Sequence, residues 1–217
     1  MTISDDTIRE YYSSRAPVYD RVYQIPERQK DLRYLEGWIP TLFQGKKILE
    51  IACGTGYWTQ FIVSTAKAVT AIDIAEETLT FAKMRPRVGH VCFRIEDAYH
   101  LSEDLGCFEG AFAGLWLSHV PKERLSAFFK NLHEHLNSGA PVLLIDNSKI
   151  QCRTLPITEK DKHGNTYQNR VLDDGTRYRV LKNFPSNNEL CRAIEGFGTH
   201  ASFQELEHFW IFKYEAA

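Results

Sequence analysis

The stretch Lys47-Ile48-Leu49-Glu50-Ile51-Ala52-Cys53-Gly54-Thr55-Gly56-Tyr57 decides the fold of this chain. It starts as an apolar run suited to a buried strand, passes through two glycines one residue apart and continues into helix-forming residues. Because glycine has no Cβ, its backbone amide can approach a ligand closely, and we expect a small-molecule cradle here. A buried acid needs a positive partner, so we place Glu50 at the carboxyl edge of the strand, facing a crevice.

The residues around the glycines decide between a ligand site and a plain turn from strand to helix. The dinucleotide fingerprint G-x-G-x-x-G requires a third glycine where this chain has Thr59, which argues against NAD. The wider string E-I-A-C-G-T-G resembles the first motif of the class I S-adenosylmethionine-dependent methyltransferases, an acid and small residues followed by G-x-G. The resemblance implies that Glu50, Ala52, Gly54 and Gly56 bind this cofactor.

Two further predicted strands each end in an acid. Residues 68–73 are apolar and close with Asp73, which follows Gly56 at close to the span of about 20 residues typical of acids that bind ribose hydroxyls. Its alternative role is to cap the next helix. Residues 91–95 form the third strand, and the following Asp97 resembles the family's adenine-binding acid. The expected adenosine contacts are Asp73, Ile74, Asp97, Ala98 and Leu115.

Residues 108–116 predict a fourth strand that resembles the family's F-D-x-A pattern, with Glu109 in place of the usual aspartate. Trp116 and His119 follow at its carboxyl edge, where the resemblance puts the methyl donor. An imidazole with a pKa near 6.5 could take a proton from the nucleophile, so His119 is a candidate base. The alternative is a packing role. Trp116 is a candidate contact for the acceptor.

The predicted fifth strand, residues 139–145, ends in Asp146-Asn147. This pair resembles part of the magnesium site of catechol O-methyltransferases. Those enzymes use a further aspartate after the fourth strand, which this chain lacks, and magnesium prefers a near-octahedral set of oxygen ligands. We therefore expect no metal.

The segment before the first strand predicts a helical arm. Ser4 and the two acids after it predict a helix start, and Pro17 should end that helix. The tyrosine-rich segment resembles the Y-x-x-x-A-x-x-Y-D arm of many small-molecule methyltransferases, although it could simply pack on the domain. The resemblance implies that Arg15 and Tyr19 hold the cofactor carboxylate and that Tyr11, on the acceptor side, and Tyr12, as a catalytic residue, lie near the reacting methyl group.

A β-hairpin is predicted after the fifth strand. Residues 166–172 and 176–181 alternate around Asp173-Asp174-Gly175, a strong turn signal. An insertion at this point should stand over the carboxyl edge of the sheet as a cap on the acceptor pocket. Arg170, Arg177 and Arg179 would then hold an anionic acceptor, or else form ordinary solvated charges on the hairpin.

Composition narrows the classes of function. The 217 residues are 43% hydrophobic with a net charge of −2, which suits one globular domain and gives no electrostatic footprint for nucleic acid. No apolar run suggests a membrane span, and the N-terminus lacks a signal-like segment, so we expect a cytoplasmic protein. The five cysteines show no C-x-x-C spacing and are expected to be reduced.

Together these features predict a single α/β domain over residues 1–217, a three-layer αβα sandwich whose seven-stranded, mostly parallel, doubly wound sheet has its last strand antiparallel. Its parts are an arm (1–44), a cofactor-binding core (45–147), a hairpin cap (148–182) and a C-terminal helix with strands (183–217). The resemblance implies in-line methyl transfer from S-adenosylmethionine to an oxygen, nitrogen or sulfur atom of a small molecule, leaving S-adenosylhomocysteine. An NAD(P)-dependent reductase and a non-catalytic cofactor-binding module remain alternatives, and the oligomeric state cannot be read.

Overall fold

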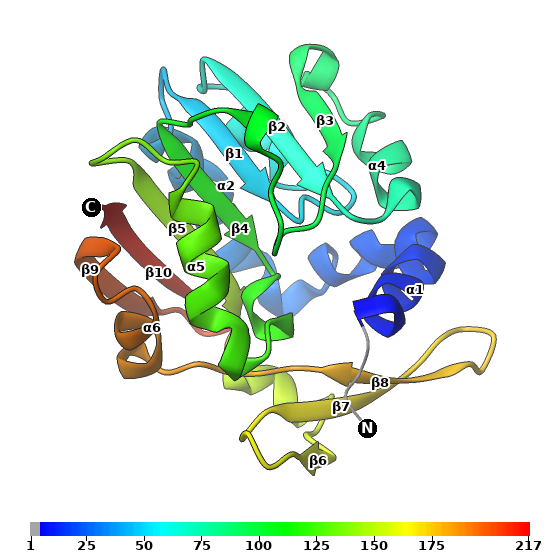
Figure 1. Cartoon of the computed structure of the whole chain (residues 1–217). Helices are drawn as coiled ribbons and strands as arrows, with labels where there is room; N and C mark the ends of the chain where they lie inside the picture. Colours follow the sequence, from blue (N-terminus) through cyan, green and yellow to red (C-terminus); the bar gives the residue numbers. More distant parts are fainter. Residues whose placement is uncertain (1–4) are drawn as a thin grey trace.

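A computed structural model describes residues 5–217, with side chains from residue 7 onward. One seven-stranded sheet has the order β3-β2-β1-β4-β5-β10-β9 (Figure 1). Its strands are β1 (Lys47–Ile51), β2 (Ala68–Asp73), β3 (Cys92–Ile95), β4 (Gly110–Gly114), β5 (Pro141–Asn147), β9 (Gly198–Glu205) and β10 (Phe209–Ala216). The strands β1 to β5 pair in parallel, whereas β10 pairs antiparallel with both β5 and β9. The predicted sheet, including its antiparallel last strand, is confirmed.

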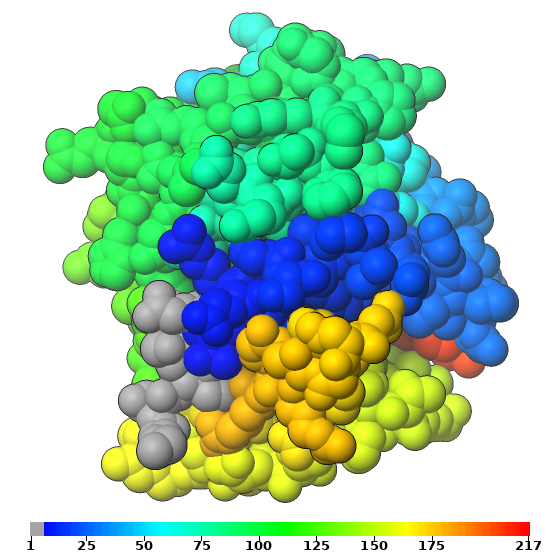
Figure 2. Space-filling view, turned by 90° about the vertical axis from the view of Figure 1, so that its right-hand side faces the viewer, coloured from blue at the N-terminus to red at the C-terminus, as the bar shows by residue number. Residues whose placement is uncertain are grey.

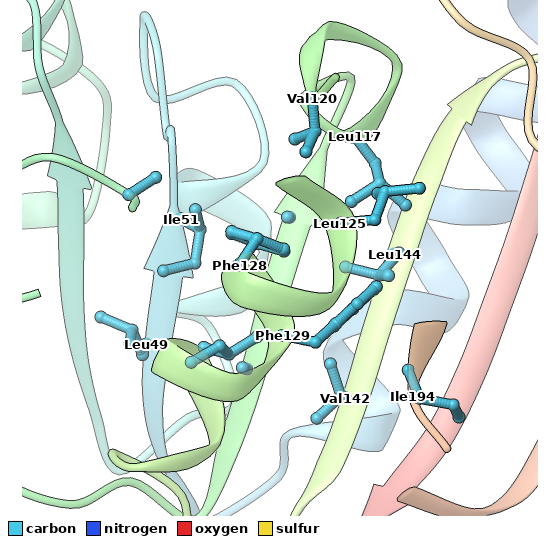
Figure 3. Packing of buried hydrophobic residues seen from close by; sticks show 14 of the residues in the cluster. Leu49, Ile51, Leu117, Val120, Leu125, Phe128, Phe129, Val142, Leu144 and Ile194 are labelled. Carbon is cyan, nitrogen blue, oxygen red and sulfur yellow. The ribbon is translucent and has the colours of Figure 1, made fainter. Parts of the chain in front are cut away.

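Helices cover both faces of the sheet because side chains along the central strands point alternately to the two faces. One apolar cluster packs Leu49 and Leu144 against α5 (Leu125–His133) and α6 (Asn187–Ala193), as Figure 3 shows. The opposite cluster packs Ile48 and its neighbours against α2 (Gln29–Leu42), α3 (Thr59–Ile62) and α4 (Glu76–Ala82). The result is the three-layer αβα sandwich expected from the sequence.

Several element boundaries differ from the sequence prediction; β5, for example, runs over Pro141–Asn147 rather than residues 139–145. The sequence predicts a second helix over about residues 27–38 that ends near Gly37 and Pro40, but α2 runs through Pro40 to Leu42 because its buried stripe of Leu32, Leu35 and Ile39 stays packed on the sheet. The strand β4 ends at Gly114, two residues early, because Leu115 turns the chain with a φ of 60°. This turn directs the following segment toward the carboxyl edge of the sheet.

The arm is the helix α1 (Asp5–Arg15), which ends just before Pro17 as predicted and continues as a 3-10 segment, Ala16–Tyr23. The predicted cap at Ser4 lies outside the described residues. The hairpin is confirmed as β7 (Thr166–Val171) and β8 (Arg177–Leu181), to which β6 (Glu159–Lys160) adds a third strand. Figure 2 shows the arm, in dark blue, lying between the core and this hairpin.

Candidate active site

The two glycines after β1 have different surroundings. Both adopt left-handed backbone conformations, with φ of 55° at Gly54 and 73° at Gly56. A Cβ added to Gly54 would meet nothing within 4 Å, whereas one added to Gly56 would lie 2.9 Å from the Cα of Ala82 on α4. Gly54 therefore leaves an open cradle. Gly56, predicted as a cofactor contact, instead lets the turn pack closely on a helix and lines neither of the cavities described below.

Asp73, at the end of β2, is tied to the glycine turn. Its Oδ2 accepts a hydrogen bond from the Gly54 amide at 2.8 Å, and its Oδ1 accepts one from the Ala75 amide at 2.9 Å. Burial raises the pKa of this carboxyl, and the two amide hydrogen bonds act against that rise. Each carboxylate oxygen keeps a further lone pair, so Asp73 can still accept from hydroxyl groups in the adjacent cavity.

A first cavity runs along the carboxyl ends of β1, β2 and β4 beneath the arm. Of the residues predicted to form the site, it is lined by Tyr12, Tyr19, Ala52, Gly54, Asp73, Ile74, Asp97, Ala98, Leu115, Trp116 and His119. Trp116, expected to contact the acceptor, thus belongs to this cavity. Asp97 accepts from the amide of Tyr99, whereas the neighbouring Glu96 is engaged by Arg94 at 2.7 Å.

Two residues of this cavity hold strained backbone conformations. Ala52 has a φ of 51° and Leu115 a φ of 60°, a region that residues with a Cβ rarely adopt. Both lie directly after strands that end at the cavity. Such conformations persist where the surrounding structure enforces them, and they concentrate at functional sites.

Glu50 does not line the cavity, contrary to the prediction that it faces a crevice. Its side chain is 1% exposed beneath the glycine turn, and Oε2 has no hydrogen-bond partner. Burial raises the pKa of Glu50 to about 8. A carboxyl with this pKa is mainly protonated near pH 7, which lowers the cost of burying it, and Glu50 lines neither cavity.

A second cavity, of about 450 Å³, opens between the arm, the end of β5 and the cap. Its cationic lining is Arg15, Arg28, Arg153, Arg170 and Lys182. Arg15, predicted as a cofactor contact, therefore lies on this side instead. Tyr11, Arg177 and Arg179 line neither cavity: Tyr11 is buried against the hairpin, Arg177 is exposed, and Arg179 pairs with Glu159 at 2.5 Å.

Four residues line both cavities: Tyr12, Tyr19, Leu115 and His119. We call the place where they meet the junction. His119 Nδ1 lies 2.7 Å from the carbonyl oxygen of Leu181, at the end of the cap. Because a carbonyl only accepts, Nδ1 carries the proton, and Nε2 accepts from the Tyr12 hydroxyl at 2.6 Å. Arm, core and cap thus meet at one imidazole.

Acid is expected to destabilise the fold through His119. Burial, and after it the charge of Lys182, lower the pKa of His119 to about 3, against about 6.5 in an unfolded chain. The unfolded chain therefore binds an extra proton between these values, so stability present above pH 6.5 is lost as the pH falls toward 3. Between pH 7 and pH 5 this loss is about 2 kcal/mol. Urea unfolding at both pH values should show a smaller loss for His119→Gln; an equal loss contradicts the assignment.

Asp146, at the end of β5, forms a buried ion pair with Lys182. Both side chains are at most 2% exposed, and Nζ lies 2.9 Å from Oδ1. Burial would raise the pKa of Asp146, but Lys182 and the amide of Ser118 outweigh it, and the pKa is lowered. The Lys182 ammonium thus lies beside Asp146-Asn147, the pair that resembles part of a magnesium site in sequence. Residues 5–217 contain no cluster of three His, Cys, Asp or Glu arranged to bind a metal.

Arg28 and Lys182 are the main site residues that the sequence did not indicate. Arg28 follows Pro26 in a short 3-10 turn and donates to Asn147 Oδ1 and to the carbonyl of Val22. Lys182 directly follows Val180 and Leu181, and all three residues are buried. Charged residues in a turn, as Arg28 is, or just after a strand, as Lys182 is, usually face solvent, so neither carried a usable signal.

Known proteins show the same combination of fold and cofactor. A family model described as a methyltransferase domain matches residues 48–139. A structure described as a DhpI-SAM-HEP complex superposes with a TM-score of 0.80 and 27% identity, covering 99% of this chain and 100% of that one. The chain is an S-adenosylmethionine-dependent methyltransferase, similar in fold to those of class I. The reductase alternative is thereby set aside.

Other relatives of this methyltransferase differ in how much they share with it. The malonyl-[acyl-carrier protein] O-methyltransferase of Serratia marcescens is 24% identical over 92% of this chain and 83% of its own length. The protein of that name from Bacillus cytotoxicus is 45% identical, but over only 27% of this chain and 21% of its own length. The N-methyltransferase NodS of Bradyrhizobium japonicum shares the fold, with a TM-score of 0.68 at 14% identity.

The cofactor of this methyltransferase is S-adenosylmethionine. Structural relatives were solved in complex with S-adenosylmethionine or with S-adenosylhomocysteine. The residues present fit it. Gly54 leaves open space where a Cβ would stand, and Asp73 keeps free lone pairs for a diol. No helix within residues 5–217 combines the length and apolarity needed to cross a bilayer.

Proposed function

We propose that this methyltransferase transfers the methyl group of S-adenosylmethionine to a small-molecule acceptor, with the cofactor in the first cavity and the acceptor in the second. The observation that carries the proposal is the junction, where Tyr12, Tyr19, Leu115 and His119 line both cavities. Methyl transfer requires donor and nucleophile to meet in line, and the junction is where the two cavities meet.

Within this proposal, Asp73, Asp97 and Gly54 of the first cavity bind the cofactor. Asp73 accepts from the ribose hydroxyls, Asp97 accepts from the adenine amino group, and the Gly54 amide lies beside the cofactor backbone. When bound, the cofactor supplies an electrophilic methyl group on a positively charged sulfur. The ring faces of Tyr12 and Tyr19 suit such a charge through cation–π attraction.

The arm and cap then exclude water from the junction. Tyr11 contacts Tyr178 of the cap with ring centroids 5.4 Å apart, and Arg21 pairs with Asp173 at 2.8 Å. Burial raises the pKa of the Tyr12 hydroxyl well above its usual value of about 10, so it stays a phenol and a hydrogen-bond donor. A dry junction favours displacement because it holds the nucleophile in attack geometry.

A small acceptor is favoured by the size of the second cavity, about 450 Å³, beneath the arm and a compact cap. Among the relatives are a malonyl-[acyl-carrier protein] O-methyltransferase and a demethylmenaquinone methyltransferase, so acceptors differ widely around this fold. All five cysteines are free, which supports a cytoplasmic location as part of the proposal.

Calorimetric titration with S-adenosylmethionine, S-adenosylhomocysteine and NADH tests the cofactor half of the proposal. We expect micromolar binding of the first two and none of NADH. His119→Ala should then lower turnover with any acceptor while cofactor affinity stays within about twofold. Loss of both together would make His119 a structural residue, and a protein that binds the cofactor but methylates nothing would be the non-catalytic module.

A further inference from the structure

The second cavity holds more positive charge than its own acids balance. Of its cations, Lys182 is neutralised by Asp146, whereas Arg15, Arg28 and Arg170 have no acidic partner among the described residues. The two acids of the lining, Glu27 and Glu207, are exposed at the rim. The cavity therefore presents three guanidinium groups that form no ion pair within residues 7–217, although the charges of Asp146 and Asp31 act on Arg28.

The contacts of these three arginines are all neutral. Arg15 donates to the Tyr11 hydroxyl at 3.0 Å, Arg28 to the Val22 carbonyl at 3.1 Å, and Arg170 to Gln168 Oε1 at 2.6 Å. Arg28 is only 7% exposed, and the Nε of Arg170 is buried without a partner. A buried unpaired cation is unfavourable, and a guanidinium fork matches carboxylate and phosphoryl oxygens. A bound anion would supply the missing charge.

The junction also lacks a free base. His119 has both nitrogens engaged, Nδ1 by the Leu181 carbonyl and Nε2 by the Tyr12 hydroxyl. Its lowered pKa makes it a weak base even when Tyr12 moves aside. None of the four junction residues is an acid. An acceptor that must lose a proton would find no strong base there, whereas an acceptor that is already an anion needs none.

Arg170 connects the two observations. It lines the second cavity together with the junction residues Tyr12 and His119, and its positive charge acts on both of them. Arg15 also acts on Tyr12 and lies 5.5 Å from the ring centroid of Tyr19. An anionic group held by these arginines would therefore be at the junction itself, and Arg28 would hold the inner end of the acceptor.

We propose that the acceptor is a small organic acid, carboxylic or phosphorus-based, held by Arg15, Arg28 and Arg170, and that one of its acid oxygens receives the methyl group. This rests on the proposed function. A lone pair of the acid oxygen forms the new O–C bond, the C–S bond breaks, and its electron pair stays on sulfur as a neutral thioether. No proton leaves, and the anion and the sulfonium cation both become neutral at the reacting atoms.

Binding is tested first on the full chain saturated with S-adenosylhomocysteine, whose own binding checks the proposed function separately. Titration with malonate and with inorganic phosphate should show saturable binding of at least one. Arg170→Gln and Arg28→Gln should each weaken it at least tenfold, and Arg170→Lys should weaken it less. Arg177→Gln, on the same hairpin but exposed, is the matched control. Failure of both anions to bind a protein that holds S-adenosylhomocysteine overturns the proposal.

Transfer is tested with methyl-labelled S-adenosylmethionine and four acceptors that share a propyl chain and differ in the group attached to it: butyrate, propylphosphonate, butanol and butylamine. Label on butyrate that alkali releases as methanol identifies a carboxyl acceptor, and an alkali-stable monomethyl ester identifies a phosphorus-based one. With butyrate as the acceptor, the rate should change less than threefold between pH 6 and pH 8. The carboxylate is already ionised over this range, and no general base has to remove a proton. Label on the alcohol or amine alone, or on no acid, overturns the proposal.

Discussion

Lys182→Met should lower the free energy of unfolding by about 3 to 5 kcal/mol, the usual result of removing one partner of a buried ion pair. The substitution keeps the volume of the side chain but leaves Asp146, which is fully buried, without its cation. Ser118 Oγ loses its donor from Nζ as well. Urea unfolding near pH 7, followed by circular dichroism, measures the change.

Two further variants make this test specific to the ion pair. The double variant Lys182→Met with Asp146→Asn removes both charges, keeps an oxygen that can accept from a backbone amide, and should recover much of the lost stability. Lys162→Met, on an exposed turn of the cap, should change stability by less than about 0.5 kcal/mol. If the single and double variants are equally unstable, Lys182 acts through packing rather than through its charge.

Asp73→Ala should weaken binding of S-adenosylhomocysteine by about 1.5 to 3 kcal/mol, or roughly 10- to 150-fold, because a charged hydrogen-bond partner is lost. The expected loss of affinity has two causes. The first is the loss of the ribose contact, and the structure shows the second. The amides of Gly54 and Ala75 both donate to this carboxylate, so the cradle itself loses its anchor.

Asp73→Asn separates the two causes. Its amide oxygen can still accept from one backbone amide, so the turn keeps part of its support while the charge is lost. We expect intermediate affinity for Asp73→Asn and unchanged affinity for Glu76→Ala, an exposed acid on the adjacent helix. Calorimetry that gives Asp73→Ala an affinity within twofold of the parent chain would remove Asp73 from the site.

The core of the fold was predictable because its signals are local. The apolar runs of β1 and β2, the glycines between β1 and α3, and the Asp-Asp-Gly turn of the cap each act within a few residues. The carboxyl edges of parallel strands meet on one side of a sheet, so Asp73, Asp97 and His119 were expected to lie together, and all three line the first cavity.

The acceptor side was less predictable because packing between distant segments decides which way each side chain faces. Arg28 enters the second cavity through its bond to Asn147, and Lys182 through its pair with Asp146. On the hairpin, Arg170 pairs with Tyr178, so strand alternation puts it on the face opposite Arg177 and Arg179, and of the three only Arg170 lines the cavity. Likewise, only the neighbouring helix α4 shows why Gly56 must be glycine.

The hydrogen bond from His119 to Leu181 has a consequence for how acceptor preference can change. The partner is a main-chain carbonyl, which every amino acid supplies, so the orientation of the imidazole does not depend on which residue stands at that position. Side chains of the inserted hairpin can therefore be exchanged, by evolution or by engineering, without removing the hydrogen bond that orients the imidazole at the junction. Substitutions in the cap can therefore alter its part of the second cavity while the imidazole keeps its orientation.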